Sequence, residues 1–187
     1  MTSSRGPRKG GLSRNEPHFP IERIDDRAGS CAFLLGVIFN QGESASRAWA
    51  APLALGARLG ALDPPKISAL PFGVLEQAMR APPALHRFPS RMAAYVQDCC
   101  SRLTDLYGGD ARRIWSPPRS AGDLLDALKG FAGIGSHKAR IAVFLLTVQF
   151  GVVVLDDGTI VSVAECPGLC EQFFPLDSAI LLEARAR

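Results

Sequence analysis

The feature that most constrains the fold is a glycine-flanked turn between two amphipathic segments, within LDALKGFAGIGSHKARIAVFLL at residues 125–146. Apolar residues recur at three- and four-residue steps on both sides of the turn, as they do along one face of a helix. In the turn, Gly133 and Gly135 flank Ile134, and glycine permits backbone angles and close approaches that other residues do not. The segment predicts two helices packed side by side, with Ile134 filling the gap between them.

The same turn predicts an anion-binding site. A helix that begins at Ser136 has unpaired backbone N–H groups and the positive end of its dipole next to the turn. Such an end binds phosphate, and Lys138 and Arg140 add positive charge near it. Because backbone N–H groups contact phosphate rather than base edges, the expected ligand is DNA bound without regard to sequence. The alternative is an ordinary helical hairpin whose glycines serve only the turn.

Hydrophobic periodicity predicts that most of the remaining chain is helical. The helical segments expected before the turn are residues 24–39, 44–59, 90–107 and 120–130. The first is apolar on nearly every side and is therefore expected at the centre of the core. After Gly151, two valine-rich stretches surround Asp156, Asp157 and Gly158, and an Asp-Gly pair between apolar runs predicts a β-hairpin. The expected fold is mainly α-helical, with a short β-hairpin near the C-terminus.

Composition divides the chain into three parts. Residues 1–20 are rich in Gly, Ser, Pro and Arg, and they predict a disordered basic arm because they bury too little apolar surface to offset chain entropy. Residues 21–152 are expected to form one helical domain, followed by a C-terminal segment of residues 153–187. The net charge is +3, and basic residues outnumber acidic ones both in the arm and across residues 44–151. This distribution suits a polyanionic partner.

Neither a membrane segment nor a cofactor is expected. No stretch approaches the roughly 18 uncharged apolar residues that span a bilayer, and the N-terminus lacks the apolar stretch of a secretory signal. The odd number of cysteines, five, argues against a disulfide framework. Cys166 and Cys170 lack the further ligands of a metal site. The expected protein is cytoplasmic.

Several stretches together resemble a known family. They are residues 34–41 (LLGVIFNQ), residues 83–89 (PALHRFP) with Met92 and Ala93, residues 107–110 (YGGD) with Trp115, and residues 133–141 (GIGSHKARI). Residues from about 34 to 152 are similar to the helix-hairpin-helix DNA glycosylase superfamily, which includes endonuclease III. More narrowly, they resemble short bacterial base excision DNA repair proteins of the HhH-GPD type. Residues 153–187 do not resemble this narrower group, so a divergent C-terminal segment is expected there.

The resemblance implies base-excision repair of double-stranded DNA in which the turn grips the lesion strand and the damaged base is flipped out. Family members that also cleave the backbone carry a lysine where this sequence has His137. Lys138 lies about 100° further around the helix, so the resemblance implies a monofunctional glycosylase with water as the nucleophile. His137 is a candidate proton acceptor, or else a solvated residue near phosphate.

The catalytic carboxylate of the family matches Asp157, which would stabilise an oxocarbenium-like sugar and orient water. The turn of the expected β-hairpin competes for this residue, because in the family a helix follows the aspartate. Gln41 matches a residue that fills the space left by the flipped base, and Arg91 is a candidate phosphate contact; either can instead be an ordinary helix-end residue. The four-cysteine cluster of some relatives is missing, so no iron–sulfur cluster is expected.

Two other functions stay open on the sequence alone. A non-catalytic DNA-binding protein shares every feature except a catalytic Asp157. A helical interaction protein without a nucleic-acid role predicts absent or salt-insensitive DNA binding, because phosphate contacts weaken steeply with salt. The glycosylase hypothesis places the protein at the bacterial nucleoid.

Overall fold

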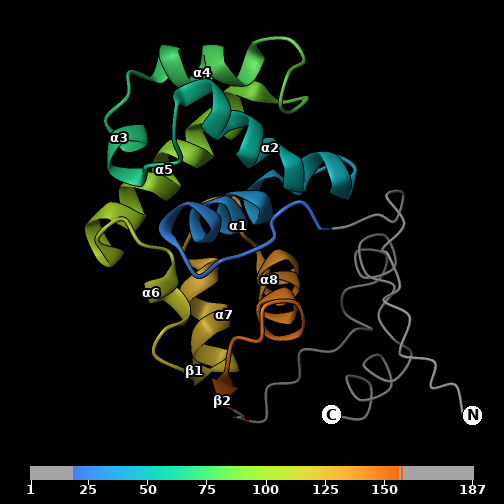
Figure 1. Ribbon diagram of the computed structural model, residues 1–187, viewed down its shortest axis with the longest axis vertical. Coiled ribbons are helices and arrows are strands. Elements are labelled where there is room, and N and C mark those ends of the chain that lie inside the picture. Colours follow the sequence, from blue (N-terminus) through green and yellow to red (C-terminus); the bar gives the residue numbers. More distant parts are fainter. Residues whose placement is uncertain (1–18, 156, 158–187) are drawn as a thin grey trace, which may run out of the picture.

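The computed structural model describes residues 19–155 and Asp157, and these form a mainly α-helical fold, as the sequence predicts (Figure 1). The helices are α1 (Arg27–Phe39), α2 (Ala45–Leu59), α3 (Pro64–Ser68), α4 (Phe72–Arg80), α5 (Pro89–Tyr107), α6 (Arg112–Trp115), α7 (Ala121–Lys129) and α8 (Ser136–Val148). Two short strands are also present, β1 (Arg119–Ser120) and β2 (Val154–Leu155). Among the described residues, none of the helices is long and apolar enough to cross a membrane.

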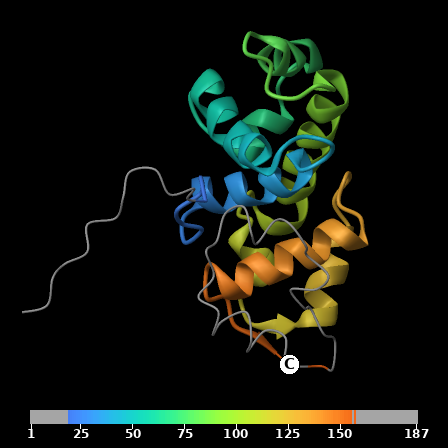
Figure 2. The ribbon, with the colours of Figure 1, turned by 90° about the vertical axis from the view of Figure 1, so that its right-hand side faces the viewer.

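Helix α1 lies between two groups of elements. Helices α2 to α5 lie on one side of it and α6 to α8 with both strands on the other, and the view turned by 90° shows the same division (Figures 1 and 2). α1 packs against α2, α5 and α8, and every residue from Ser30 to Phe39 is buried. The expectation of a central helix, apolar on nearly every side, is confirmed.

A glycine in α1 allows α2 to approach closely. A Cβ atom at Gly36 would overlap the six-membered ring of Trp49, so a larger residue would displace the indole. Trp49 is fully buried, and its ring centroid lies 5.6 Å from that of Phe33. Trp49 therefore belongs to the core.

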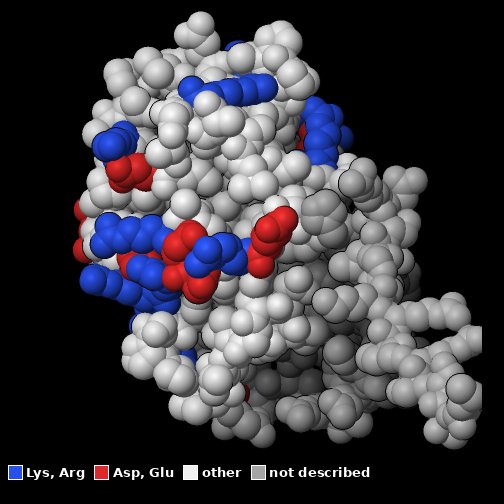
Figure 3. Space-filling model, in the orientation of Figure 1, with Lys and Arg blue, Asp and Glu red and all other residues white. Residues whose placement is uncertain are grey.

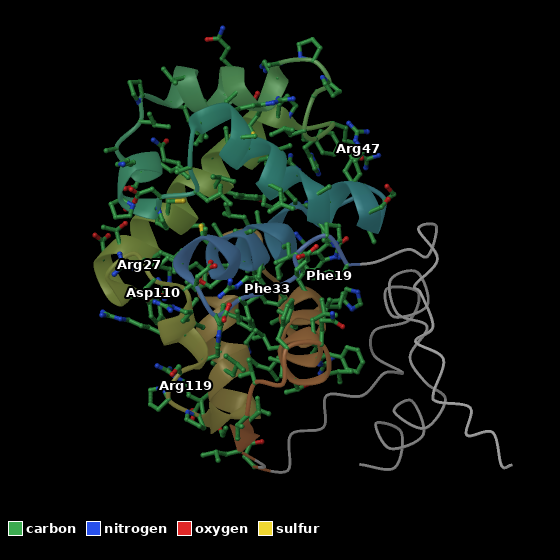
Figure 4. The ribbon with its side chains drawn as sticks, in the orientation of Figure 1. Phe19, Arg27, Phe33, Arg47, Asp110 and Arg119 are labelled. Atoms are coloured by element: carbon green, nitrogen blue, oxygen red, sulfur yellow. The ribbon has the colours of Figure 1, made fainter. Side chains whose placement is uncertain are left out.

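Phe19 corrects one expected boundary. Its side chain is buried, and its ring centroid lies 4.7 Å from that of Trp49 and 5.9 Å from that of Phe150 (Figure 4). The core therefore begins before residue 21, because an aromatic residue ahead of α1 covers rings from α2 and from the segment after α8. Residues 1–18 of the expected arm lie outside the described residues.

β2 corrects the expected end of the helical domain. Val154 pairs with Arg119, and Leu155 with Ser120, in a parallel two-stranded sheet. Val154 also packs against the hydrophobic core, so the domain extends past residue 152. The second strand of the expected β-hairpin and the rest of the divergent segment, residues 158–187, lie outside the described residues.

Candidate nucleic-acid interface

Helices α7 and α8 pack against each other and are joined by the turn of residues 130–135. Ile134 is 4% exposed, and its N–H donates to the Phe131 carbonyl oxygen at 3.1 Å, as expected for a residue that fills the gap between the helices. Gly133 has a φ of +81°, and a Cβ atom there would lie 2.8 Å from Cδ2 of Tyr95. The turn therefore requires glycine at position 133, for its backbone angle and for its contact with α5.

The N-terminus of α8 follows this turn without a side-chain cap. Gly135 is the N-cap residue, with an extended backbone and no side chain that could accept from the first turn. The N–H groups of Ser136, His137 and Lys138 have no acceptor within the helix, as at any helix start. Gly135, Ser136 and His137 are exposed, so this end of the helix can bind an anion through its N–H groups and its dipole.

Lys138 is turned inward, which differs from the surface phosphate contact expected from the sequence. Its Nζ donates to the Ile38 carbonyl oxygen of α1 at 2.8 Å and to the Gly133 carbonyl oxygen of the turn at 2.9 Å. Helical side chains lean toward the N-terminus of their helix, so an inward-facing lysine in the first turn of α8 reaches back to the hairpin. The side chain is half-buried, and burial lowers the pKa of its amine to about 8.

His86 connects the C-terminal end of α1 to the loop before α5. It is fully buried; its Nε2–H donates to the Gln41 carbonyl oxygen at 3.0 Å, and its Nδ1 accepts the Phe88 N–H at 3.0 Å. These two bonds require the neutral imidazole with its proton on Nε2. Burial lowers the pKa of His86. Gln41 itself is half-buried, and its carbonyl group holds the loop.

Next to His86, an exposed aromatic ring lies close to two guanidinium groups. Phe88 is 41% exposed, and Cζ of Arg87 and of Arg91 lie 4.7 and 5.6 Å from its ring centroid. Both arginines are exposed. Such a ring can stack on an unpaired base while guanidinium groups contact phosphate. Arg91 was expected from the sequence, whereas Arg87, Phe88 and His86 were missed; the available signal was an aromatic residue interleaved with arginines.

Three segments thus meet at the C-terminal end of α1, and together they form what we call the junction surface: residues 40–44, residues 82–91 and residues 130–138. Figure 2 shows the turn between α7 and α8 at the edge of the molecule, close to the loop after α1. Glu43 adds to the contacts by accepting the Arg87 N–H at 2.9 Å and pairing with Arg47 at 3.4 Å. His137 and Arg140 are exposed at the start of α8.

Asp157 lies away from the junction surface, unlike the expected site residues of the turn. Its Oδ2 accepts the Gly122 N–H at 2.8 Å, at the N-terminus of α7, whereas the turn leaves the other end of that helix. α7 has nine residues, a length of about 13 Å. Asp157 is exposed, and in this position it acts as a helix cap.

Another group of basic residues, on a different face, pairs with carboxylates. Lys and Arg side chains lie beside Asp and Glu in the region where Figure 4 labels Arg27 and Asp110 (Figure 3). Asp110 is 5% exposed; it pairs with Arg112 at 2.7 Å and with Arg27 at 3.8 Å. These paired charges offer a polyanion less attraction than the arginines around Phe88.

No group of three or more His, Cys, Asp or Glu residues that could hold a metal ion occurs within residues 19–155 and Asp157. Cys31, Cys99 and Cys100 are free and buried. Cys166 and Cys170 lie outside the described residues.

No protein-family model matches the sequence, and no curated protein matches it. Among solved structures, the fold is similar to that of a trapped covalent intermediate of endonuclease III with DNA, the estranged-adenine complex, at a TM-score of 0.46 and 24% sequence identity. The similarity covers 64% of this chain and 47% of that chain, so this chain spans less than half the length of the structure it matches.

Proposed function

We propose that this protein binds double-stranded DNA through the junction surface and acts in base-excision repair as a monofunctional DNA glycosylase. The observation that carries the proposal is the uncapped N-terminus of α8 directly after the Gly133–Gly135 turn. Free N–H donors and a helix dipole suit phosphate. The exposed Phe88 ring and its two guanidinium groups, on the same surface, suit an unstacked nucleotide.

The sequence resemblance to helix-hairpin-helix glycosylases supports hydrolysis of an N-glycosidic bond as the reaction. Water is the proposed nucleophile, because His137 stands where lyase members carry a lysine. The neighbouring Lys138 amine donates to two carbonyl oxygens, which supports a structural rather than a nucleophilic role. His137 is the proposed proton acceptor on the exposed side of α8, and Asp157 the proposed carboxylate.

A non-catalytic DNA-binding protein is the second candidate. The position of Asp157 favours it, because this carboxylate caps α7 at the end opposite the turn. The two candidates share the junction surface and the same expected affinity for duplex DNA, so they differ only in base release.

The experiment is base release from duplexes that carry uracil, hypoxanthine, alkylated purines, 8-oxoguanine or thymine glycol, read with and without alkali. Strand breaks that appear only after alkali are the expected result and name the substrate. Breaks without alkali would contradict the monofunctional assignment. Silence across the panel, with duplex binding that weakens as salt rises, would favour the second candidate. Absent or salt-insensitive binding would contradict both.

A further inference from the structure

One amine joins the turn between α7 and α8 to α1, through a hydrogen bond between residues that are one hundred positions apart in the sequence. Lys138 Nζ donates to the Ile38 carbonyl oxygen at 2.8 Å and to the Gly133 carbonyl oxygen at 2.9 Å. Ile38 belongs to the last turn of α1, where carbonyl groups have no partner within the helix and carry the negative end of its dipole. The ammonium therefore satisfies the end of α1 and holds the turn against it.

The turn is held on another side by α5, where Gly133 lies against the ring of Tyr95. Its position depends on both contacts: packing against an aromatic ring on one side, and the hydrogen bonds of the Lys138 amine on the other.

Within residues 19–155 and Asp157, Lys138 has no carboxylate as a counter-ion. His86, from the loop before α5, interacts electrostatically with Lys138, and it also interacts with Glu43 and Arg87. Tyr95 of α5 packs against Gly133, whose carbonyl oxygen accepts from Lys138. His137 and Arg140 are its charged or titratable neighbours along α8. Among the described residues no carboxylate forms an ion pair with Lys138; its two recorded partners are carbonyl oxygens. Lys138 and His86 act on each other electrostatically, and Lys138 lowers the pKa of His86.

A partly desolvated cation without a counter-ion is stabilised by an anion bound nearby. The N-terminus of α8, where phosphate is proposed to bind, includes Lys138 in its first turn. Burial already lowers the pKa of this amine to about 8, so the free protein holds a mixture of charged and neutral Lys138 near that pH. Bound phosphate raises the pKa again, and linkage then requires proton uptake on binding.

We propose that DNA binding at the turn is coupled to protonation of Lys138, which acts as a positioning residue between α1 and the hairpin. The coupling rests on the proposed function, since it needs phosphate at the start of α8. Its sign is fixed: affinity is highest well below pH 8, where the amine is charged in the free protein, and decreases as pH rises through 8. At a pH high enough for the amine to be neutral in both states, duplex affinity is lower by about tenfold for each unit by which bound DNA raises its pKa.

The test measures duplex affinity at constant ionic strength from pH 7 to pH 9.5, with thermal melting at each pH to verify folding. Wild type is expected to lose affinity over this range, by up to about tenfold if bound DNA raises the pKa of the amine by one unit. Lys138→Met is expected to bind more weakly at pH 7 and without this fall. Lys138→Arg keeps the charge at every pH, so it is expected to bind at pH 7 as wild type does and to show no fall. Lys66→Met is the matched control, because Lys66 is an exposed lysine on α3 paired with Asp63, and it should behave as wild type.

Calorimetry in buffers of different ionisation enthalpy gives a second readout, because it counts protons taken up on binding. Wild type should take up a fraction of a proton at pH 8, and Lys138→Arg none. The coupling is overturned if Lys138→Arg still loses affinity as pH rises, or if wild type does not. In either case the proposal that the protein binds DNA is unaffected. Borohydride trapping of a covalent complex that requires Lys138 also overturns it, because the amine would then be a nucleophile. Absence of salt-sensitive duplex binding by wild type at every pH overturns the proposed function, and the coupling with it.

Discussion

His86 Nε2 lies 3.0 Å from the Gln41 carbonyl oxygen, and this hydrogen bond joins the loop before α5 to the loop after α1. The other ring nitrogen accepts the Phe88 N–H, so both nitrogens of a fully buried imidazole are used. The pair fixes how the exposed Phe88 ring lies relative to Gln41. The geometry of the junction surface therefore depends on a neutral histidine.

Acidification is expected to weaken this connection. Because burial lowers the pKa of His86, the unfolded chain binds the proton more readily than the folded one. The contribution of His86 to the free energy of unfolding is therefore complete above pH ~6.5 and is lost progressively as pH falls below it. Urea unfolding from pH 4.5 to 7.5 checks this. His86→Gln is the reference, because its stability changes with pH only through the other titratable groups, chiefly the carboxylates. Equal acid-side losses in both proteins would show that His86 does not contribute.

Two glycines of one turn are expected to respond differently to alanine. Gly133→Ala should lower the free energy of unfolding by about 1–3 kcal/mol, because it combines a positive φ with an overlap against Tyr95. Gly135 has φ −86° and ψ 178°, and an added Cβ meets nothing within 4 Å. Gly135→Ala should therefore change stability by less than about 0.5 kcal/mol. Urea unfolding of the two variants measures the difference, and similar values would contradict the geometry of the turn.

Two phenylalanines of similar exposure allow the role of the ring in the junction surface to be isolated. Phe88→Ala is expected to weaken duplex binding by about 1–3 kcal/mol if one base stacks on the ring. Phe72, on α4, is 42% exposed against 41% for Phe88, and no guanidinium group is recorded over its ring among the described residues. Phe72→Ala should leave affinity unchanged. Fluorescence anisotropy with a labelled duplex compares them, and an equal loss in both variants would assign the effect to general surface apolarity.

Helices α1, α2, α5, α7 and α8 could be predicted because their signals are local. Ser120 accepts the Asp123 N–H at 3.1 Å as the N-cap of α7, and Gly108 ends α5 in a left-handed conformation. Apolar residues at helical spacing between such signals specify a helix whatever the rest of the chain does. The turn between α7 and α8 could also be predicted, because its glycines lie between two adjacent helical patterns in the sequence.

The junction surface could not be predicted, because its contacts join residues far apart in the sequence. No local pattern indicates that Lys138 reaches Ile38 or that His86 reaches Gln41. The same limit applies to β2: a valine-rich run predicts a strand but not its partner, and the observed partner is β1, before α7. Phe19 is a further example. It follows a polar segment in the sequence, and it is buried because it packs against Trp49 and Phe150, which are distant in the sequence.

Asp157 is the residue for which structural and catalytic roles can be separated by substitution. Its Oδ2 accepts the Gly122 N–H in the first turn of α7, where a helix has no acceptor of its own. Asp157→Ala is expected to lower the free energy of unfolding by about 1 kcal/mol, and Asp157→Asn by less, because an amide oxygen can still accept. Neither should change duplex affinity, since the turn lies at the other end of the helix.

Base release then decides between the two roles. The glycosylase proposal with Asp157 as its carboxylate expects Asp157→Asn to abolish base release while duplex affinity and thermal stability stay near wild type, because the amide keeps the cap but cannot stabilise a cationic sugar. Base release that survives both substitutions would remove the carboxylate from the reaction and leave Asp157 as the cap of α7. If base release decreases only in Asp157→Ala, and in proportion to the lower stability of that variant, the role of Asp157 is again structural. The asparagine variant differs from wild type only in the charge that catalysis needs, so its full activity would show that this charge is not used.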